Sequence, residues 1–244
     1  MLTSVAPTRY TLQDLASFNG ANGLSPEAGL IMDSSGNLYG TTWGGGADGE
    51  GTVFEVANGS GTITTLATFD GTNGSEPNAG LIMDDSGNLY GTTRNGSATG
   101  VGTVFEVVNG SGTITTLATF DNTHGAHPQA SLIMDGSGNL YGTTLGGGAG
   151  SCGTVFEVAH GSGTITTLTS FNGPNGSTPL AGLIMDDDGN LFGTTALGGA
   201  NDSGIVFEWQ VSSGTIVTLA TFDSTNGASP SCSLIMDSGG ENLR

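Results

Sequence analysis

The sequence predicts an all-β protein, a five-bladed β-propeller built from 51-residue repeats of four strands each. The first observation is a repeat without insertion or deletion, marked by five prolines at a constant 51-residue spacing: Pro26, Pro77, Pro128, Pro179 and Pro230. The second is that no window shows apolar residues at helical spacing, whereas glycine supplies 45 of 244 residues and falls between short apolar runs. Four antiparallel strands in about 40–50 residues is the size of a propeller blade.

Each repeat is expected to fold as a meander of four strands. In the second copy these strands are residues 81–83, 88–93, 103–108 and 113–120. Asp84 and Gly87 form the first turn, because aspartate accepts backbone N–H bonds and glycine tolerates positive φ. A glycine-rich loop over 94–102 precedes the third strand. Asn109-Gly110 then predicts a tight hairpin before the fourth.

The two ends of the chain continue the register of the repeat. Leu2–Val5 and Thr11–Phe18 align with strands three and four, while Leu234–Met236 and Asn242–Leu243 align with strand one and the start of strand two. This predicts a single domain, 1–244, whose closing blade is shared by the termini. The units are approximately 19–69, 70–120, 121–171, 172–222, and 223–244 completed by 1–18. A fragment of a longer array, with an open edge, is the alternative.

The charge balance excludes two classes of partner. The net charge is −19, lysine is absent, and the three arginines are Arg9, Arg94 and Arg244. Nucleic acids and anionic membranes need clustered Lys and Arg, so neither is expected as a partner. No apolar run approaches the roughly 18 residues of a membrane span. The first residues lack the basic and apolar regions of a signal peptide, so none is expected in this sequence.

Variation between the copies gathers at one end of the predicted blades. Residues 59–70 and 110–121 are identical, whereas the connection 70–79, the loop 94–102 and their equivalents differ. In a meander these two connections share one end, which we call the variable face. The opposite end carries the turns at 84–87 and 109–112 and their equivalents, and we call it the uniform face. Loops on a rigid scaffold suit ligand binding, and neutral drift is the alternative.

The favoured function is that of a non-enzymatic extracellular binding or adhesion module, with glycans or a cell-surface polymer as ligand. Near-identical blades present equivalent sites, and multivalency then strengthens weak binding. The expected contacts open the glycine loops or follow a proline at the channel mouth: Trp43, Arg94, Asn95, Asn78 and Gln129.

The alternative function is a hydrolase acting on an extracellular polysaccharide or ester at the channel mouth. Glu27 is the only acidic residue directly after one of the five prolines, and Glu76 and His127 directly precede theirs. They are the candidates for general acid, stabilising carboxylate and base. The glutamates of the third strands (Glu55, Glu106, Glu157 and Glu208) lack lysine partners and need hydroxyls, backbone donors or a cation. Their repetition favours a structural role over catalysis.

No cofactor or metal is expected. An aspartate, such as Asp33 or Asp84, directly follows the Met at the end of the first strand of each repeat. In the favoured interpretation it is a hairpin-turn residue, and in the alternative it is a calcium ligand. His124 and His127 form a His-x-x-His pair and are weak metal candidates, because a metal site usually needs a third ligand.

The repeated pattern resembles the Gloeobacter/Verrucomicrobium ("GloVer") tandem repeat. The likeness is carried by Gly-Asn-Leu-Tyr-Gly-Thr-Thr at 87–93 and Gly-Thr-Val-Phe at 102–105, and it covers about residues 11–236. The resemblance implies a β-propeller repeat on a bacterial surface or outside the cell. It implies no catalytic residue. The Asp-x-x-Gly-Asn-Leu-Tyr-Gly-Thr segment is also similar to sensor-type propeller repeats.

Overall fold

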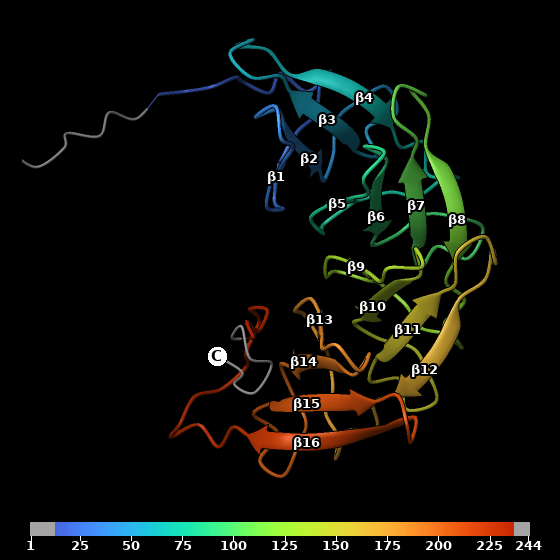
Figure 1. Ribbon diagram of the computed structural model, residues 1–244, viewed down its shortest axis with the longest axis vertical. Coiled ribbons are helices and arrows are strands. Elements are labelled where there is room, and N and C mark those ends of the chain that lie inside the picture. The colour runs from blue at the N-terminus through green and yellow to red at the C-terminus, as the bar shows by residue number, and fades with distance from the viewer. Residues whose placement is uncertain (1–12, 237–244) are drawn as a thin grey trace, which may run out of the picture.

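The computed structural model describes residues 13–236. The strands in this range form four separate antiparallel sheets of four strands each, which we call blades one to four in chain order (Figure 1). Their bounds are β1 (Ile31–Met32), β2 (Leu38–Thr42), β3 (Thr52–Val56), β4 (Thr64–Thr68); β5 (Ile82–Met83), β6 (Leu89–Thr93), β7 (Thr103–Val107), β8 (Thr115–Thr119); β9 (Ile133–Met134), β10 (Leu140–Thr144), β11 (Thr154–Val158), β12 (Thr166–Ser170); β13 (Ile184–Met185), β14 (Leu191–Thr195), β15 (Ile205–Gln210), β16 (Thr215–Thr221).

Every blade is the predicted meander. Each sheet runs in chain order, β5-β6-β7-β8 in the second blade, and every neighbouring pair is antiparallel. The expected strands of that blade differ from those observed by at most two residues at an end. The register slips by one between Val104 and Phe105 on β7, so the third and fourth strands are joined across a bulge. The same slip recurs in the other three blades.

No helix in residues 13–236 is long and apolar enough to span a membrane.

The apolar core lies between the blades. Phe69 from the end of the first blade packs edge to face on Phe105 of the second, with ring centroids 5.0 Å apart, and both rings are fully buried. Equivalent pairs join Phe120 to Phe156 and Phe171 to Phe207. Burying one such ring contributes about 2–3 kcal/mol. Each blade is therefore stable only against its neighbour, as the repeat predicted.

A glycine in the second strand of each blade makes room for these rings. A Cβ on Gly91 would lie 2.7 Å from Cζ of Phe105 and 3.1 Å from Cδ2 of Leu81. Real Cβ atoms do not approach so closely, so the ring position depends on glycine at this point. Gly40, Gly142 and Gly193 are equally crowded by the phenylalanine of their own blade. This explains the Gly of the repeated Leu-Tyr-Gly-Thr-Thr segment.

The variable and the uniform segments lie at opposite ends of the blade, as the sequence predicts. The connection into the first strand pairs with the loop between strands two and three, through bridges such as Ser75 to Asn95. These variable segments therefore share one end of the blade. At the other end, the Asn109 N–H donates to Oδ1 of Asn88 at 3.0 Å and joins the two short turns.

The described residues form four blades, not the five expected, in an arc whose two ends do not meet (Figure 1). Residues 13–18 and 234–236, expected to lie in strands of the closing blade, form none. Leu2–Val5 and Asn242–Leu243 lie outside the described residues. The flank of blade one is accordingly open: Leu30 is 51% exposed, whereas its equivalent Leu81 is 2% exposed. Phe18 nevertheless packs edge to face on Phe54, as Phe69 does on Phe105.

Candidate functional site

The residue before the second, third and fourth prolines (Glu76, His127 and Thr178) links two blades on the variable face. The backbone N–H of His127 donates to the Val101 carbonyl of the preceding repeat at 2.9 Å. The backbone carbonyl of His127 accepts from the Leu145 N–H at 3.3 Å. This double contact is made with φ at +56°, a left-handed conformation that costs a residue other than glycine about 1 kcal/mol or more. All five pre-proline residues have this left-handed φ: Ser25, Glu76, His127, Thr178 and Ser229. It is a feature of the fold that places these side chains at the junctions between blades.

One junction carries a connected set of polar side chains, which we call the junction cluster: Glu76, Arg94, Asn95 and His127. Asn95 Nδ2 donates to Glu76 Oε2 at 2.6 Å, and Asn95 Oδ1 lies 3.0 Å from His127 Nδ1. Arg94 Nη1 stands 3.9 Å from the same Glu76 oxygen, and its Nε is buried without a hydrogen-bond partner among the described residues. The cluster thus spans blades two and three.

The hydrogen bonds of the cluster assign the protons. A carboxylate only accepts, so Asn95 must turn its amide nitrogen to Glu76 and its oxygen to His127. His127 Nδ1 also lies 3.1 Å from the Arg94 carbonyl. Both neighbours of Nδ1 are acceptors, so Nδ1 carries the hydrogen. In the neutral imidazole Nε2 then keeps its lone pair and is free to accept a hydrogen bond or a proton.

The cluster occurs once in this repeated structure. The positions of Glu76 and His127 hold Ser25, Thr178 and Ser229 in other copies, and the position of Arg94 holds Trp43, Leu145 and Ala196. Arg94 is also the single Arg or Lys within residues 13–236. A specialised group of residues on a symmetric scaffold is the arrangement expected of a grafted site.

The other predicted contacts lie outside these hydrogen bonds. Glu27 is exposed in the first repeat, and among the described residues it has no hydrogen bond to Glu76 or His127. Asn78 and Gln129 are half-buried, and Asn78 Oδ1 is buried without a partner in the part of the chain described. Trp43 is 37% exposed in the loop whose Glu50 carbonyl accepts from the Glu76 N–H. Asn95 therefore joins Glu76 and His127, two of the three proposed catalytic residues, and among the described residues Glu27 shares no hydrogen bond with them.

The two histidines of the weak metal candidate turn to different partners. His124 Nδ1 lies 2.9 Å from Asp121 Oδ2 within its own loop, whereas His127 faces Asn95. Among residues 13–236, no three His, Cys, Asp or Glu side chains gather in a way that could hold a metal ion.

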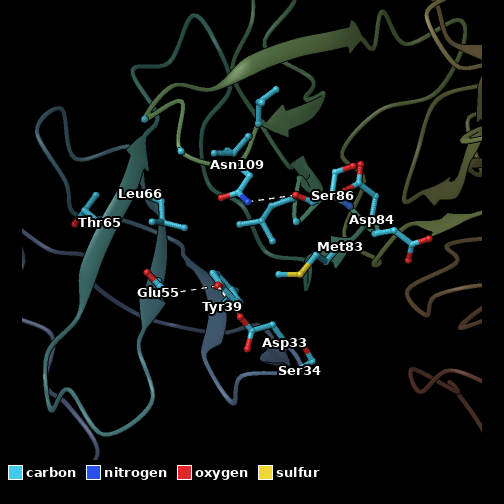
Figure 2. A pocket seen from close by; sticks show the side chains of 17 residues that line it. Asp33, Ser34, Tyr39, Glu55, Thr65, Leu66, Met83, Asp84, Ser86 and Asn109 are labelled. Atoms are coloured by element: carbon cyan, nitrogen blue, oxygen red, sulfur yellow. Dashed lines mark hydrogen bonds between the residues drawn. The ribbon is translucent and has the colours of Figure 1, made fainter.

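The uniform face has a groove at each junction between blades, and sequence reasoning missed these grooves. Figure 2 shows the first, which holds about 690 Å³ and is lined by Tyr39, Glu55 and Leu66 of blade one and by Met83 and Asp84 of blade two. Similar grooves follow between blades two and three and between blades three and four. The available signal was the near-identity of the turns in the first three repeats, which gives the first two grooves similar linings.

A tyrosine hydroxyl lies between two carboxylates in each of the first three blades. Tyr90 Oη is 3.1 Å from Asp84 Oδ2 and 2.9 Å from Glu106 Oε1. Tyr39 and Tyr141 make the same contacts with their own aspartate and glutamate, and Figure 2 shows the Tyr39–Glu55 bond. The hydroxyl partner expected for the strand glutamates is thus this tyrosine. Burial, Asp33 and Glu55 together raise the pKa of Tyr39 to about 12.

The turn role predicted for the aspartates is confirmed. Asp84 Oδ1 accepts the N–H groups of Ser86 and Asn88 at 2.9 and 2.8 Å, and the same pattern recurs at Asp33, Asp135 and Asp186. Partial burial acts to raise the pKa of Asp84, but the hydrogen bonds from Asn88, Ser86 and Tyr90 outweigh it and hold the pKa below its ordinary value. Asp237 lies outside the described residues.

Blades that pack through repeated phenylalanine pairs define a propeller-like repeat protein. The chain belongs to the Gloeobacter/Verrucomicrobia repeat family, which matches residues 1–133 and 84–243. The resemblance noted in the sequence is therefore confirmed. No curated protein matches the sequence.

Solved structures share the fold at low sequence identity. TolB from Acinetobacter baumannii is 16% identical, with a TM-score of 0.53 over 90% of this chain and 47% of its own. The extracellular domain of the hybrid two-component system BT4673 from B. thetaiotaomicron is 13% identical, with a TM-score of 0.59 over 90% and 25%. A structure assigned as a gluconolactonase is 15% identical, with a TM-score of 0.51 over 88% and 69%. This chain spans about half of TolB and a quarter of the sensor domain, and these likenesses show the propeller-like fold alone.

Proposed function

We propose that this chain is a non-enzymatic extracellular binding module for glycans, and that the junction cluster on its variable face is the first contact. The observation that carries the proposal is the Glu76–Asn95–His127 chain of hydrogen bonds, which holds planar polar groups rigidly across two blades. Preorganised side chains lose little conformational entropy when a ligand binds.

The chemistry of the cluster suits a polyhydroxylated ligand. A sugar hydroxyl both donates and accepts hydrogen bonds. The cluster offers acceptors at the Glu76 carboxylate and at His127 Nε2, and donors on the Arg94 guanidinium. The neighbouring loop adds the exposed ring of Trp43 as an apolar surface for the face of a sugar ring. Asn78 and Gln129, close to the prolines of the same two blades, are the proposed secondary contacts.

The extracellular location is part of the proposal. A sensor domain described as extracellular is among the structures of similar fold, and the family resemblance pointed the same way. The strongly acidic composition suits a protein that stays soluble outside the cell.

A glycan array at high protein density tests the binding function. Asn95→Ala removes the link between Glu76 and His127, and we expect it to weaken binding to any glycan recognised by the unchanged protein. Thr178→Ala alters the equivalent pre-proline position of the next repeat and is the matched control, expected to bind normally. No binding by the unchanged protein would discredit the glycan proposal. Equal losses in both variants would argue against the junction cluster as the site.

Hydrolysis of a polysaccharide or ester is the second candidate, favoured by the free Nε2 of His127. In that case His127 acts as the base, Glu76 as the stabilising carboxylate and Glu27 as the general acid. Each is replaced singly by alanine and assayed on glycoside and ester panels. The assignment fails if the unchanged protein turns over none of these substrates, or if all three variants keep full activity.

We further propose that residues 1–18 and 223–244 complete a fifth blade and close the ring. Two contacts support this. Phe18 packs on Phe54 as the preceding blade does elsewhere, and Ser233 Oγ accepts the Gly182 N–H at 3.1 Å on the opposite flank. Deletion of residues 1–18 should then lower the melting temperature sharply, because it uncovers Phe54 and removes the two strands proposed for the closing blade. An unchanged melting temperature would favour an open array instead.

A further inference from the structure

Glu76 and Arg94 form a charge pair within the junction cluster that no other described repeat has. Arg94 is the single Arg or Lys of residues 13–236, and it lies in the same repeat as Glu76, the only carboxylate that directly precedes one of the five prolines. Both side chains are accessible, with 40% of the Arg94 side chain and 26% of the Glu76 side chain exposed. A ligand at the junction cluster therefore meets the two charges together.

The distance between the two groups leaves room for a bridging group. Arg94 Nη1 lies 3.9 Å from Glu76 Oε2, which is longer than an N–H···O hydrogen bond of about 2.7–3.2 Å. Asn95 Nδ2 donates to the same Oε2 at 2.6 Å and holds the carboxylate in place. A carboxylate oxygen accepts more than one hydrogen bond, so Oε2 can accept a second one. A group that accepts from Arg94 and also donates to Glu76 therefore suits this gap.

A sugar hydroxyl has both capacities, and an ionised carboxylate has only one. A hydroxyl oxygen about 2.8 Å from both atoms accepts a hydrogen from the guanidinium and donates its own hydrogen to Glu76. A ligand carboxylate also accepts from the guanidinium, but it has no hydrogen for Glu76 and is repelled by the negative charge there. An arginine without a negative partner favours a carboxylate, because charge-assisted pairs are strong. The presence of Glu76 therefore reverses the usual preference of an arginine.

The other charges of the variable face act in the same direction. Its connections and loops, within the described residues, hold one guanidinium and eight carboxylates: Glu27, Asp48, Glu50, Asp70, Glu76, Asp121, Asp202 and Asp223. The field over this face repels anions. Salt at about 0.15 M largely screens charges more than about 8 Å away, so the nearest carboxylate has the strongest effect on a ligand beside Arg94. That carboxylate is Glu76.

We propose that the junction cluster selects uncharged glycans over glycans that carry carboxylates, and that Glu76 sets this specificity. The inference rests on the glycan-binding function proposed above and names its ligand class. A hydroxyl of the neutral sugar bridges Arg94 Nη1 and Glu76 Oε2. A uronic acid meets a positive charge that Glu76 has already neutralised, and it gains no compensating hydrogen bond.

Binding to matched pairs of sugars tests the specificity. An array carries glucose, galactose and mannose beside the corresponding uronic acids, which keep the ring and replace the exocyclic hydroxymethyl group by a carboxylate. Affinities are measured at about pH 8, above the ordinary range of histidine titration. We expect the unchanged protein to bind a neutral member at least about tenfold more tightly than its uronic acid.

Glu76→Gln separates the charge of the carboxylate from its place in the cluster. The glutamine keeps an oxygen that accepts from Asn95, and the guanidinium of Arg94 loses its negative partner. Uronic acids should then bind about tenfold more tightly than they bind the unchanged protein. The double variant Glu76→Gln with Arg94→Gln should lose this gain.

Asp48→Asn is the matched control for net charge. It removes one carboxylate from an exposed position of the variable face, and Asp48 has no hydrogen bond to the junction cluster in the part of the chain that the structure describes. The ratio of the neutral to the acidic affinity should stay unchanged. Thermal melts of every variant check that the fold is kept.

The possible failures of the two proposals are distinguishable. Equal affinities of the unchanged protein for neutral sugars and uronic acids would overturn the specificity and leave the glycan-binding function standing. The role of Glu76 is overturned by an equal gain in Asp48→Asn, or by a gain that persists in the double variant. No binding to any sugar would discredit the glycan-binding function and this inference with it.

Discussion

The tyrosine held between two carboxylates offers a sharp test of the forces in each blade. In Tyr90→Phe the ring keeps its position on β6, opposite Glu106 of β7, and only the hydroxyl is lost. Asp84 Oδ2 and Glu106 Oε1 then lose a donor that stands 3.1 and 2.9 Å from them. The carboxylates of Asp84 and Glu106 then face each other without the hydroxyl hydrogen that lay between them.

The expected loss in the free energy of unfolding corresponds to one hydrogen bond. The hydroxyl has two acceptors but one proton, so a single hydrogen bond to a charged group is lost, worth about 1.5–3 kcal/mol. Tyr90 is half-buried and water reaches part of the site, so the lower end applies. We expect a loss of about 1.5 kcal/mol in the free energy of unfolding, or roughly 3–6 °C in the melting temperature of a chain of this size.

Blade four supplies the matched control. Phe192 already stands at this position, and Glu208 accepts from Gln210 Nε2 at 3.2 Å instead. Phe192→Tyr should therefore be neutral or stabilise the protein by up to about 1 kcal/mol. Urea unfolding followed by circular dichroism measures both variants. A Tyr90→Phe variant within about 0.3 kcal/mol of the unchanged protein would refute the bridging role of the hydroxyl.

Two further predictions concern packing and pH. Gly91→Ala places a Cβ 2.7 Å from the Phe105 ring and should destabilise the protein by about 1–3 kcal/mol. Gly136→Ala meets no atom within 4 Å and should change the stability little, as measured by the same urea unfolding. The pKa of Asp84 in the folded chain lies below its ordinary value of 3.8, so the stability it contributes is full above that value and is lost as the pH falls through the folded pKa. Asn88→Ala removes a side-chain donor to that carboxylate, so the stability of this variant should depend less steeply on pH below 3.8, and an unaltered acid profile would contradict this assignment.

The interior of each blade was predictable because its signals are local. Asp84 and Gly87 make their turn through contacts within five residues of sequence. Asn109 and Gly110 lie in a turn closed by the Ser111 N–H on the Val108 carbonyl, but the connection between β7 and β8 is longer than the tight hairpin predicted. The period of 51 residues then implied that the apolar strands stack on their neighbours. The turn role of the aspartates followed from the same short-range chemistry.

The candidate sites were only partly predictable because they form between blades. The sequence singled out Glu76, Arg94, Asn95 and His127 separately, as departures from their own repeats, but it assigned them to different functions. Their union depends on the left-handed conformation at His127, which turns one blade's side chain toward the loop of another. No local pattern encodes that contact across 32 residues.

The sequence by itself determined the four-stranded blade, its turns and the division into a variable and a uniform face, because each rests on contacts between near neighbours in the chain. The tertiary structure decided which side chains meet: the junction cluster, and the tyrosine hydroxyls between carboxylates. These contacts join residues of different strands and blades, so they exist only once the phenylalanine rings have set the blades against each other.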